Sequence, residues 1–373
     1  MLKQANGQAI IQAFEQFSPK SLAVEGDKVG LQVGTLNKKI NKVMIALDVL
    51  EPVVDEAIEK GVDLIIAHHP IIFKPIKALR TDQTYGRTIE KLIKHDITVY
   101  AAHTNLDVAS GGVNDMMAEA LELEEVDILV ETGQDPLKKL VVFVPEEQAS
   151  DVREAIGSVG AGFIGNYSHC SFTSQGMGAF KPEEGTDPFI GKQGEMEYVD
   201  EVKVETVFHE SIEKQVIRAM MDAHPYEEVA YDLYEMASSG KPFGLGRIGY
   251  VKEELTLDQF ANKVKQAFDV KGVRVVGDGK RIIRKVALLG GDGNKYAFTA
   301  LHKGADVYVT GDLYYHVAHD AMMEGLSMID PGHNVEKIMK EGVRRKMKSF
   351  VEDKKYSTEV IVSEVHTDPF RFL

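Results

Sequence analysis

The sequence predicts an α/β protein in which two pseudo-symmetric, βαβ-containing halves form one core, with a further domain inserted between them. Three observations lead to this prediction. A segment of the first half matches a segment of the second half without gaps, each of these segments has the pattern of strand, helix and strand, and the pattern changes between about residues 137 and 236. Alternation of strands and helices is typical of parallel sheets.

The internal match aligns "KVMIALDVLEPVVDEAIEKGVDLIIAHH" (Lys42–His69) with "KVALLGGDGNKYAFTALHKGADVYVTGD" (Lys285–Asp312). Asp63 and Asp306 are one of the identical pairs. Each copy starts as an apolar strand, continues as an amphipathic helix, turns at a glycine and ends in a second strand. A further helix and strand follow each copy, so each half is predicted to have the order βαβαβ.

The region between the halves has a different predicted order, which is strand, helix and strand, then a loop, and then strand, helix and strand again. That order is the ferredoxin-like plan of an α+β domain. Turn-rich stretches, "ETGQDP" and "ASSGKPFG", flank the region, as is common at domain boundaries. The predicted division is residues 1–130 for the first half of the core, 131–238 for the inserted domain and 239–373 for the second half.

Composition excludes several classes of protein. The formal net charge of −15 disfavours electrostatic binding to nucleic acid. Cys170 is the only cysteine, which excludes a disulfide framework and a cysteine-based zinc site. The first residues lack the pattern of a signal peptide and no apolar run reaches the length of a membrane span, so we expect a cytoplasmic protein.

Ligand-type side chains gather where the predicted strands end. "AHHP" places His68 and His69 at the end of a buried strand, "HTNLD" adds Asp107 after the next strand, and "DPGHNVE" places His333 and Glu336 three residues apart on one face of a helical turn. Three imidazoles and two carboxylates suit zinc, manganese, iron or nickel. Five ligands fit two metal ions if one carboxylate, most simply Asp107, bridges them. The structural alternative is that His333 caps a helix and Asp107 makes a turn.

Two other histidines are candidates for catalysis. His103 opens the "HTNLD" motif, and His316 follows "TGD" in the second half. Each could act as an acid or base or could orient a ligand, and each could equally be a hydrogen-bonded structural residue. The glycine-rich "GGDGN" stretch could be either an anion-binding turn or a tight connection from strand to helix.

The motifs "DKVGLQVG", "AHHP", "HTNLD", "GLGRIG", "TGD…H" and "DPGHN…E" occur in this order. Together they resemble the GTP cyclohydrolase I type 2 homolog family, also described as the dinuclear-metal-centre hexameric, NGG-interacting-factor-like family. The resemblance covers both halves of the core and implies a toroidal homohexamer with two divalent metal ions per subunit, zinc first and manganese, iron or nickel as alternatives. The inserted region resembles the ferredoxin-like, PII-like insert of the longer members.

The resemblance also implies ligand positions, which fall on His68, His69, Asp107, His333 and Glu336. One departure concerns the last pair, because some members place the final His and Glu four residues apart and this sequence places them three apart. Both spacings leave the two side chains on one helix face.

The family name suggests a hydrolase in which metal-activated water attacks a small-molecule substrate of the nucleotide type. A two-metal phosphoesterase is one alternative, because paired metal ions commonly support in-line displacement. A non-enzymatic hexameric metal-binding or regulatory protein, with the insert as a sensor, is another.

Overall fold

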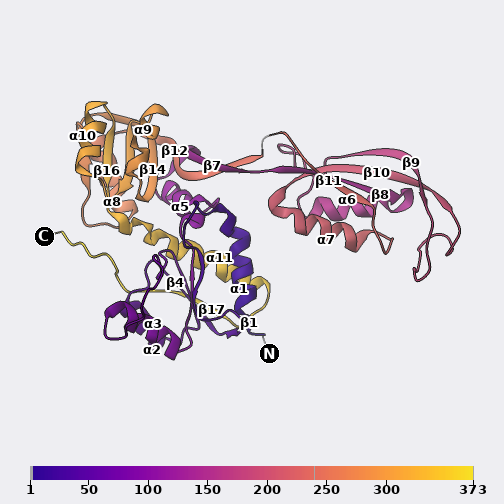
Figure 1. Ribbon diagram of the computed structural model, residues 1–373. Coiled ribbons are helices and arrows are strands. Elements are labelled where there is room, and N and C mark those ends of the chain that lie inside the picture. The colour runs from indigo at the N-terminus through magenta and orange to yellow at the C-terminus, as the bar shows by residue number, and fades with distance from the viewer. Residues whose placement is uncertain (1–2, 239, 373) are drawn as a thin grey trace. The chain divides into compact units, whose positions relative to one another are not determined.

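The computed structural model describes residues 3–238 and 240–372, which form two compact units (Figure 1). One unit is an α/β body made of the chain up to Thr132 and from Phe243 onward, and the other, the inserted unit, is Gly133–Pro242. The expected mixed α/β fold, with several sheets and helices, is confirmed. Within the described ranges, no helix is both long enough and apolar enough to cross a bilayer.

The first sheet of the α/β body has five strands. Their order is β17 (Glu359–Val362), β4 (Lys42–Ala46), β5 (Leu64–Ala67), β6 (Thr98–Ala101) and β2 (Gly30–Val33). All neighbours run parallel except β6 and β2. Met44 and Ala46 pack against one pair of helices, whereas Val43 and Ile45 face the other pair, because successive residues of a strand point to opposite faces. The two pairs are α2 (Glu51–Glu59) with α3 (Thr84–Lys94), and α1 (Gly7–Phe17) with α11 (Met339–Asp353).

The second sheet has six strands. Their order is β13 (Arg274–Val276), β16 (Ser327–Asp330), β15 (Val307–Gly311), β14 (Ile282–Asp292), β12 (Lys241–Thr256) and β7 (Leu123–Asp135). The central strands β14, β15 and β16 are parallel, β13 runs antiparallel to β16, and β12 runs antiparallel to β14. One face packs on α5 (Val113–Ala120) and α8 (Leu257–Ala267), and the other on α9 (Ala297–His302) and α10 (Tyr315–Met323). A single buried cluster contains side chains of both sheets, so the two halves share one core.

The internal match of the sequence corresponds to equivalent structure. The carboxylate of Asp63 accepts a hydrogen bond from the backbone N–H of Lys42 at 3.1 Å, and the carboxylate of Asp306 accepts one from the N–H of Lys285 at 2.9 Å. In each copy the aspartate that precedes the second strand therefore fixes the backbone where the parallel pairing of the two strands begins.

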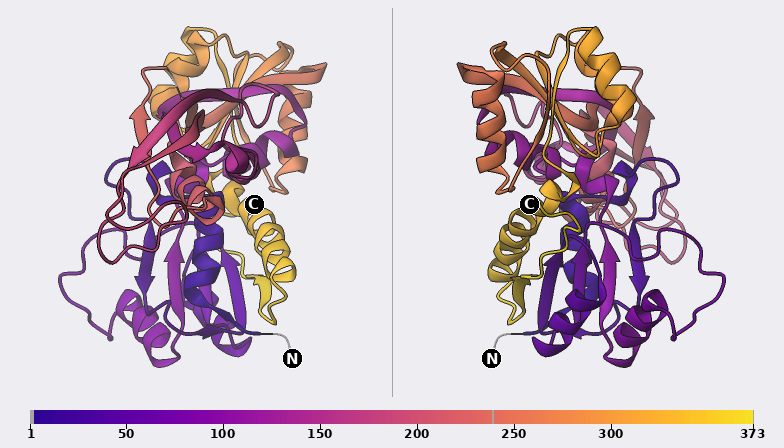
Figure 2. Two further views of the ribbon diagram at one scale, coloured as in Figure 1. Left: turned by 90° about the vertical axis from the view of Figure 1, so that its right-hand side faces the viewer. Right: turned by 90° about the vertical axis from the view of Figure 1, so that its left-hand side faces the viewer.

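The two halves of the chain interlock instead of forming separate bodies. The C-terminal strand β17 pairs with β4 of the first sheet, and β7, which precedes the insert, is an edge strand of the second sheet. Figure 2 shows the yellow helix α11, from the C-terminal part of the chain, lying beside the strands of the first sheet, most of which come from the N-terminal part. The sequence patterns indicated the βαβαβ units but not these outer strands, because the pairing of edge strands depends on contacts between distant segments.

The inserted unit has the chain order β8 (Leu137–Pro145), α6 (Ala149–Ser158), β9 (Ser171–Phe180), β10 (Glu197–His209), α7 (Glu213–Ala223) and β11 (Tyr231–Glu235). Its strands form an antiparallel sheet in the order β11-β8-β10-β9. Both helices pack on one face around a buried cluster of its own. The remaining short elements are β1 (Ala5–Asn6), β3 (Lys39–Ile40), α4 (Thr104–Val108), η1 (Lys20–Leu22), η2 (Glu146–Gln148), η3 (Glu210–Ile212), η4 (Asn294–Tyr296) and η5 (His333–Ile338).

Candidate metal centre

Polar side chains lie at the carboxyl ends of parallel strands in both sheets of the α/β body. His68 and His69 follow β5, and Asp107 lies on the short helix α4 that follows β6. From the second sheet, His333 and Glu336 lie on η5 directly after β16. Because the two sheets share one core, these strand ends converge.

The structure brings together all five residues that the sequence analysis named as ligands. Glu336 lies at the centre, since its Oε2 is 3.0 Å from His69 Nε2, 3.3 Å from His333 Nε2 and 3.5 Å from His68 Nε2. Asp107 Oδ1 is 3.7 Å from His68 Nε2. Two sets of three ligand atoms, each within 4.8 Å of one another, could therefore hold a metal ion: His68 with Asp107 and Glu336, and His69 with His333 and Glu336.

His103 joins this cluster and His316 does not. His103 forms a third such set with His68 and His69, and its ring centroid lies 5.4 Å and 5.8 Å from theirs. His316 is exposed on α10, and no potential ligand set in the described part of the chain includes it. The catalytic role suggested for either residue stays a prediction.

The four histidines of the cluster are oriented in the same way, because each uses Nδ1 for a hydrogen bond to a protein oxygen. The partners are the carbonyl of Ala102 for His68 at 2.8 Å, Asp48 for His69 at 2.7 Å, Asp27 for His103 at 2.8 Å and Asp312 for His333 at 2.6 Å. An oxygen at Nδ1 holds the proton on that nitrogen and leaves Nε2 for a metal ion, an arrangement usual for metal-binding histidines.

The sequence analysis gave no role to Asp27, Asp48 or Asp312. Asp48 and Asp312 had a usable signal, because both follow parallel strands of the repeated unit. Asp27 lies before β2 in the "DKVGLQVG" stretch and is separated from His103 by 76 positions. Only the fold could assign these aspartates to their histidines.

Two buried polar atoms of the cluster have no hydrogen-bond partner within the described chain, His68 Nε2 and Asp107 Oδ1. Unpaired polar atoms are rare in protein cores because their desolvation costs about 1–3 kcal/mol. A divalent cation accepts electron pairs from both kinds of atom, so the donor set fits a metal ion.

Burial and neighbouring charges shift the pKa values of the cluster in opposite directions. Burial raises the pKa of Asp107 to about 6, against the opposing charge of His68. Burial also acts to raise the pKa of Glu336, but the surrounding histidines outweigh it and hold that pKa well below its usual range. For His69, burial is outweighed by hydrogen bonds to two carboxylates, which raise its pKa to about 10, and hydrogen bonding to Glu336 helps to raise the pKa of His333 to about 9. The cluster therefore packs opposite charges into a small buried volume.

The glycine-rich stretch at the end of β14 gives Glu336 its space. Gly291 has φ +66°, and a Cβ on it would lie 2.6 Å from Glu336 Oε1. The backbone N–H of Gly290 donates to Asn114 Oδ1 at 2.9 Å, and the side-chain amide of Asn114 donates to the carbonyl of Asp107 at 2.9 Å. The N–H of Gly290 is therefore used inside the protein. In this respect the stretch acts as a tight connection between segments that carry ligands.

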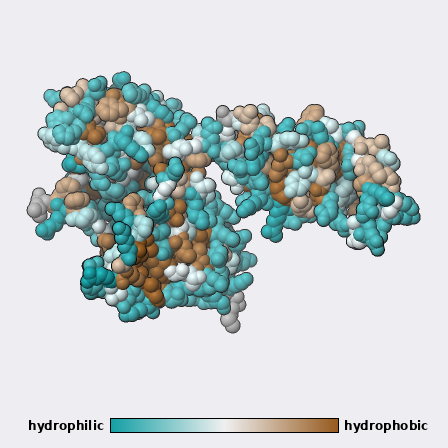
Figure 3. Space-filling view, viewed as in Figure 1, coloured by the Kyte–Doolittle hydropathy of each residue, from teal (hydrophilic) through white to brown (hydrophobic). Residues whose placement is uncertain are grey.

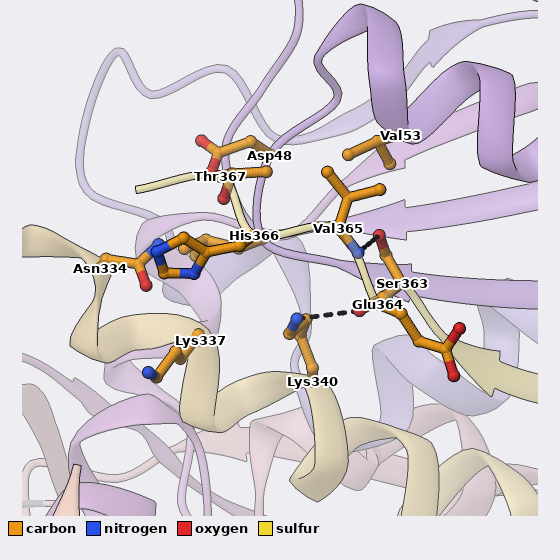
Figure 4. Close-up of a pocket in the computed structure, with 11 residues that line it drawn as sticks. Asp48, Val53, Asn334, Lys337, Lys340, Ser363, Glu364, Val365, His366 and Thr367 are labelled. Atoms are coloured by element: carbon orange, nitrogen blue, oxygen red, sulfur yellow. Dashed lines mark hydrogen bonds between the residues drawn. The ribbon is translucent and has the colours of Figure 1, made fainter. Parts of the chain in front are cut away.

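Two cavities adjoin the cluster. One, of about 340 Å³, is lined by Asp27, Lys28, Gln32 and apolar residues that include Phe73. The ring of Phe73 meets that of His103 edge-on, with 6.4 Å between the ring centroids. The other, of about 90 Å³, lies beside Asp48 and contains Lys337 and Lys340 (Figure 4). Asp27 and Asp48 thus connect each cavity to one histidine of the cluster.

Comparisons with known proteins agree with the motifs. A family model described as Duf34/NIF3 (NGG1p interacting factor 3) matches residues 5–369. The chain is 62% identical over 372 residues to a protein of Halalkalibacterium halodurans and 63% identical over 373 residues to one of Bacillus subtilis, and both alignments cover 100% of each chain. Both relatives are named GTP cyclohydrolase 1 type 2 homolog.

Solved structures extend the similarity to the whole fold. A Bacillus cereus protein related to NIF3 superposes with a TM-score of 0.93 at 58% identity, and a Staphylococcus aureus protein with a TM-score of 0.76 at 33% identity. Each comparison covers 100% of both chains. The resemblance inferred from the sequence motifs is confirmed.

Proposed function

We propose that this chain, which belongs to the Duf34/NIF3 family, holds two divalent metal ions between the carboxyl ends of its two sheets. The observation that carries the proposal is the pair of buried, unpartnered atoms His68 Nε2 and Asp107 Oδ1. Zinc is the first candidate because imidazole and carboxylate ligands suit it, and manganese, iron and nickel remain alternatives.

The proposed ligands are His68, His69, Asp107, His333 and Glu336. The sequence analysis gave the bridging role to Asp107, but the distances favour Glu336, whose Oε2 lies within 3.5 Å of three imidazole nitrogens. Glu336 is therefore proposed as the ligand that both ions share.

The proposed reaction is hydrolysis. A bound divalent ion supplies a Lewis acid and lowers the pKa of a coordinated water. His103 has Nδ1 held by Asp27, so it can hold or move a proton at Nε2 or add a ligand to the cluster. The cavity beside Phe73 offers an apolar wall for the organic part of a substrate.

A nucleotide-type substrate is proposed from the names of the relatives and from the cavity drawn in Figure 4. Lys340 donates to the carbonyl of Ser363 at 2.9 Å and Lys337 to the carbonyl of Asp269 at 2.9 Å, so neither ammonium is neutralised by a carboxylate within the described residues. The carboxylates of Asp48 and Glu364 line the same cavity, so these two ammonium groups are the ones proposed to meet an anionic group of the substrate. They equally support the alternative of a two-metal phosphoesterase.

The metal proposal is tested by the metal content of purified variants. His68→Ala and His69→Ala should each lose at least half of the bound metal per chain, measured by inductively coupled plasma mass spectrometry, while circular dichroism stays that of a folded protein. His302→Ala, which removes an exposed histidine of α9 in the same unit, is the matched control and should keep its metal. Full occupancy in both cluster variants would contradict the proposal.

The reaction is tested separately, with protein loaded in turn with zinc, manganese, iron and nickel. GTP, other nucleotides and generic phosphoesters are the substrates, and activity should disappear with a chelator and return with metal. Ring opening without phosphate release indicates the cyclohydrolase reaction, and phosphate release indicates a phosphoesterase. Fully loaded protein that turns over none of them favours the non-enzymatic, regulatory alternative.

The inserted unit is proposed to be a ferredoxin-like domain of the PII-like kind. Two observations support this, the sheet order β11-β8-β10-β9 and the placement of α6 and α7 on one face. That plan places the first and third strands of the unit at the centre of an antiparallel sheet.

A toroidal homohexamer is proposed for the assembly. Large apolar side chains are exposed on the α/β body, among them Leu31, Phe73, Ile76 and Leu79. Figure 3 shows hydrophobic residues gathered on one face of the α/β body, around the region that Figure 1 labels β4. Exposed apolar patches commonly mark interfaces. Analytical ultracentrifugation should give the mass of six chains, and a stable monomer at micromolar concentration would contradict the proposal.

A further inference from the structure

The inserted unit contains a cavity that the proposed metal chemistry does not use. Its volume is about 290 Å³, and its walls come from the end of β9, the loop 181–196, one residue of β10 and the segment that follows α7. Ligand pockets in proteins run from about 300 to 1,000 Å³, so the cavity suits a small molecule.

Aromatic rings form one wall of this cavity. The ring of Tyr226 lies 5.7 Å from that of Phe180 and 6.3 Å from that of Phe189, with interplanar angles of 59° and 51°. Pro182, Pro188 and Ile190 add further apolar surface. The faces of aromatic rings carry partial negative charge and attract cations.

Carboxylates supply the charge of the cavity. Glu201, Glu227 and Glu228 line it, whereas no lysine, arginine or histidine among the described residues does. Glu201 accepts a hydrogen bond from the hydroxyl of Tyr226 at 2.9 Å, and Glu227 accepts one from the backbone N–H of Asp187 at 3.2 Å. Within the described residues none of the three carboxylates forms a salt bridge, so the cavity is negatively charged beside an aromatic wall.

The loop that covers the cavity is held by its own hydrogen bonds. The N–H of Gly194 donates to the carbonyl of Pro182 at 2.7 Å, and the side chain of Gln193 donates to the carbonyl of Thr186 at 2.7 Å. These bonds close the loop on itself and keep Phe189 at the cavity. The site is therefore formed before any ligand enters.

We propose that this cavity binds a small organic cation with apolar substituents, such as a quaternary or alkylated ammonium compound. The aromatic wall receives the apolar, positively charged head, and the carboxylates neutralise its charge. A neutral apolar molecule would leave the three carboxylates without a counter-charge, and an anion would be repelled by them. The proposal is independent of the metal centre and gives the inserted unit a ligand of its own.

The test uses the full-length protein and two probes of the same shape. Choline carries a trimethylammonium head, and 3,3-dimethylbutan-1-ol replaces that head by a neutral tert-butyl group. Tyrosine fluorescence reports binding without interference, since the chain has no tryptophan, and isothermal titration calorimetry gives the affinity. Choline should bind saturably and about tenfold or more tightly than the neutral alcohol.

Two variants locate the site. Glu201→Gln removes one charge of the cavity and Phe189→Ala removes one ring, and each should weaken choline binding by about tenfold. Glu184→Gln and Phe172→Ala are the matched controls, because they remove the same groups from the inserted unit outside the cavity lining, and both should bind choline as the unchanged protein does. The proposal is overturned if the two probes bind equally, if choline does not bind at tens of millimolar, or if the controls weaken binding as much as the cavity variants.

Discussion

At the scale of single residues, one carboxylate organises the cluster. Glu336 is 3% exposed and lies between three imidazoles that come from two different sheets. A buried carboxylate needs partners of opposite charge, and these histidines can provide them. Asp107 is also buried but approaches only one of them closely, His68.

This difference predicts an order of damage. Glu336→Gln should lower the metal content per chain more than Asp107→Asn does, because the glutamate reaches both sets of ligand atoms and the aspartate only one. We expect a loss of most of the metal in the first variant and of about half in the second. Mass spectrometry of the metal content after dialysis at matched free metal checks this, and the reverse order would make Asp107 the shared ligand.

At the scale of elements, the end of strand β14 decides whether Glu336 has room. Gly291 and Gly304 both have a positive φ, +66° and +78°, but only Gly291 has protein atoms within 4 Å of an added Cβ. Those atoms include Oε1 of Glu336 and Nε2 of His333. A side chain at either glycine would strain the backbone, but only a side chain at Gly291 would also crowd the proposed metal site.

Gly291→Ala should lower both stability and metal content, whereas Gly304→Ala should lower stability alone. Left-handed backbone costs an alanine about 1–2 kcal/mol, so both variants should unfold at lower denaturant concentration. Denaturation curves and metal analysis of the two purified proteins make the comparison. Equal metal loss in both variants would show that strain, and not contact with Glu336, disturbs the cluster.

His224, at the end of α7, makes the stability of the inserted unit depend on pH. It is buried, its Nε2 donates to the carbonyl of Phe143 at 2.9 Å and its Nδ1 accepts from the backbone N–H of Tyr226 at 3.1 Å. The bond from Tyr226 needs an unprotonated Nδ1 and therefore the neutral ring, and burial lowers the pKa of His224 below 6.5. Its contribution to stability is therefore complete above that value and is lost as the pH falls through the lowered pKa.

We expect the strands of the inserted unit to exchange amide hydrogens faster at pH 5 than at pH 7, after correction for intrinsic rates. In the variant His224→Gln the side chain at this position does not titrate. The variant should therefore lose the part of the pH effect that is due to His224. Hydrogen exchange followed by mass spectrometry resolves the peptides of β8. An unchanged pH dependence in the variant would assign the effect to other groups.

At the scale of the whole molecule, the two chain segments of the α/β body that flank the insert contact each other. Thr132 Oγ1 lies 3.5 Å from the carbonyl of Phe243, and a Cβ on Gly244 would lie 1.9 Å from the carbonyl of Val130. Strands β7 and β12 are therefore adjacent where the chain leaves for the insert and where it returns. All residues of the proposed metal site belong to the α/β body.

Replacing residues 133–242 by an Asn-Gly turn should leave a folded protein that still binds metal. The turn can join the ends of two adjacent strands, and the shared core of the two sheets contains none of the described residues of the insert. Circular dichroism, sedimentation and metal content test the deletion variant, with the full-length protein as control. Insoluble or metal-free protein would show that the insert is needed for folding of the body.

The sequence by itself determined the βαβαβ units, the strand ends that carry histidine and carboxylate groups, and the identity of the proposed ligands. Each of these follows from a local pattern, since apolar periodicity marks strands and helices and parallel strands present their carboxyl ends at one edge. The match of Asp63 with Asp306 indicated that the two halves contain equivalent units, and the two aspartates make equivalent hydrogen bonds.

Only the tertiary structure decided which groups meet. Glu336 and His69 are 267 positions apart, Asp27 and His103 are 76 apart, and β17 crosses from the end of the chain to β4. No local pattern encodes such contacts, because they result from the packing of two sheets on one core. The same packing leaves His316 on the surface of α10 and draws His103 into the cluster, a distinction that depends on position in the fold and not on the residue type.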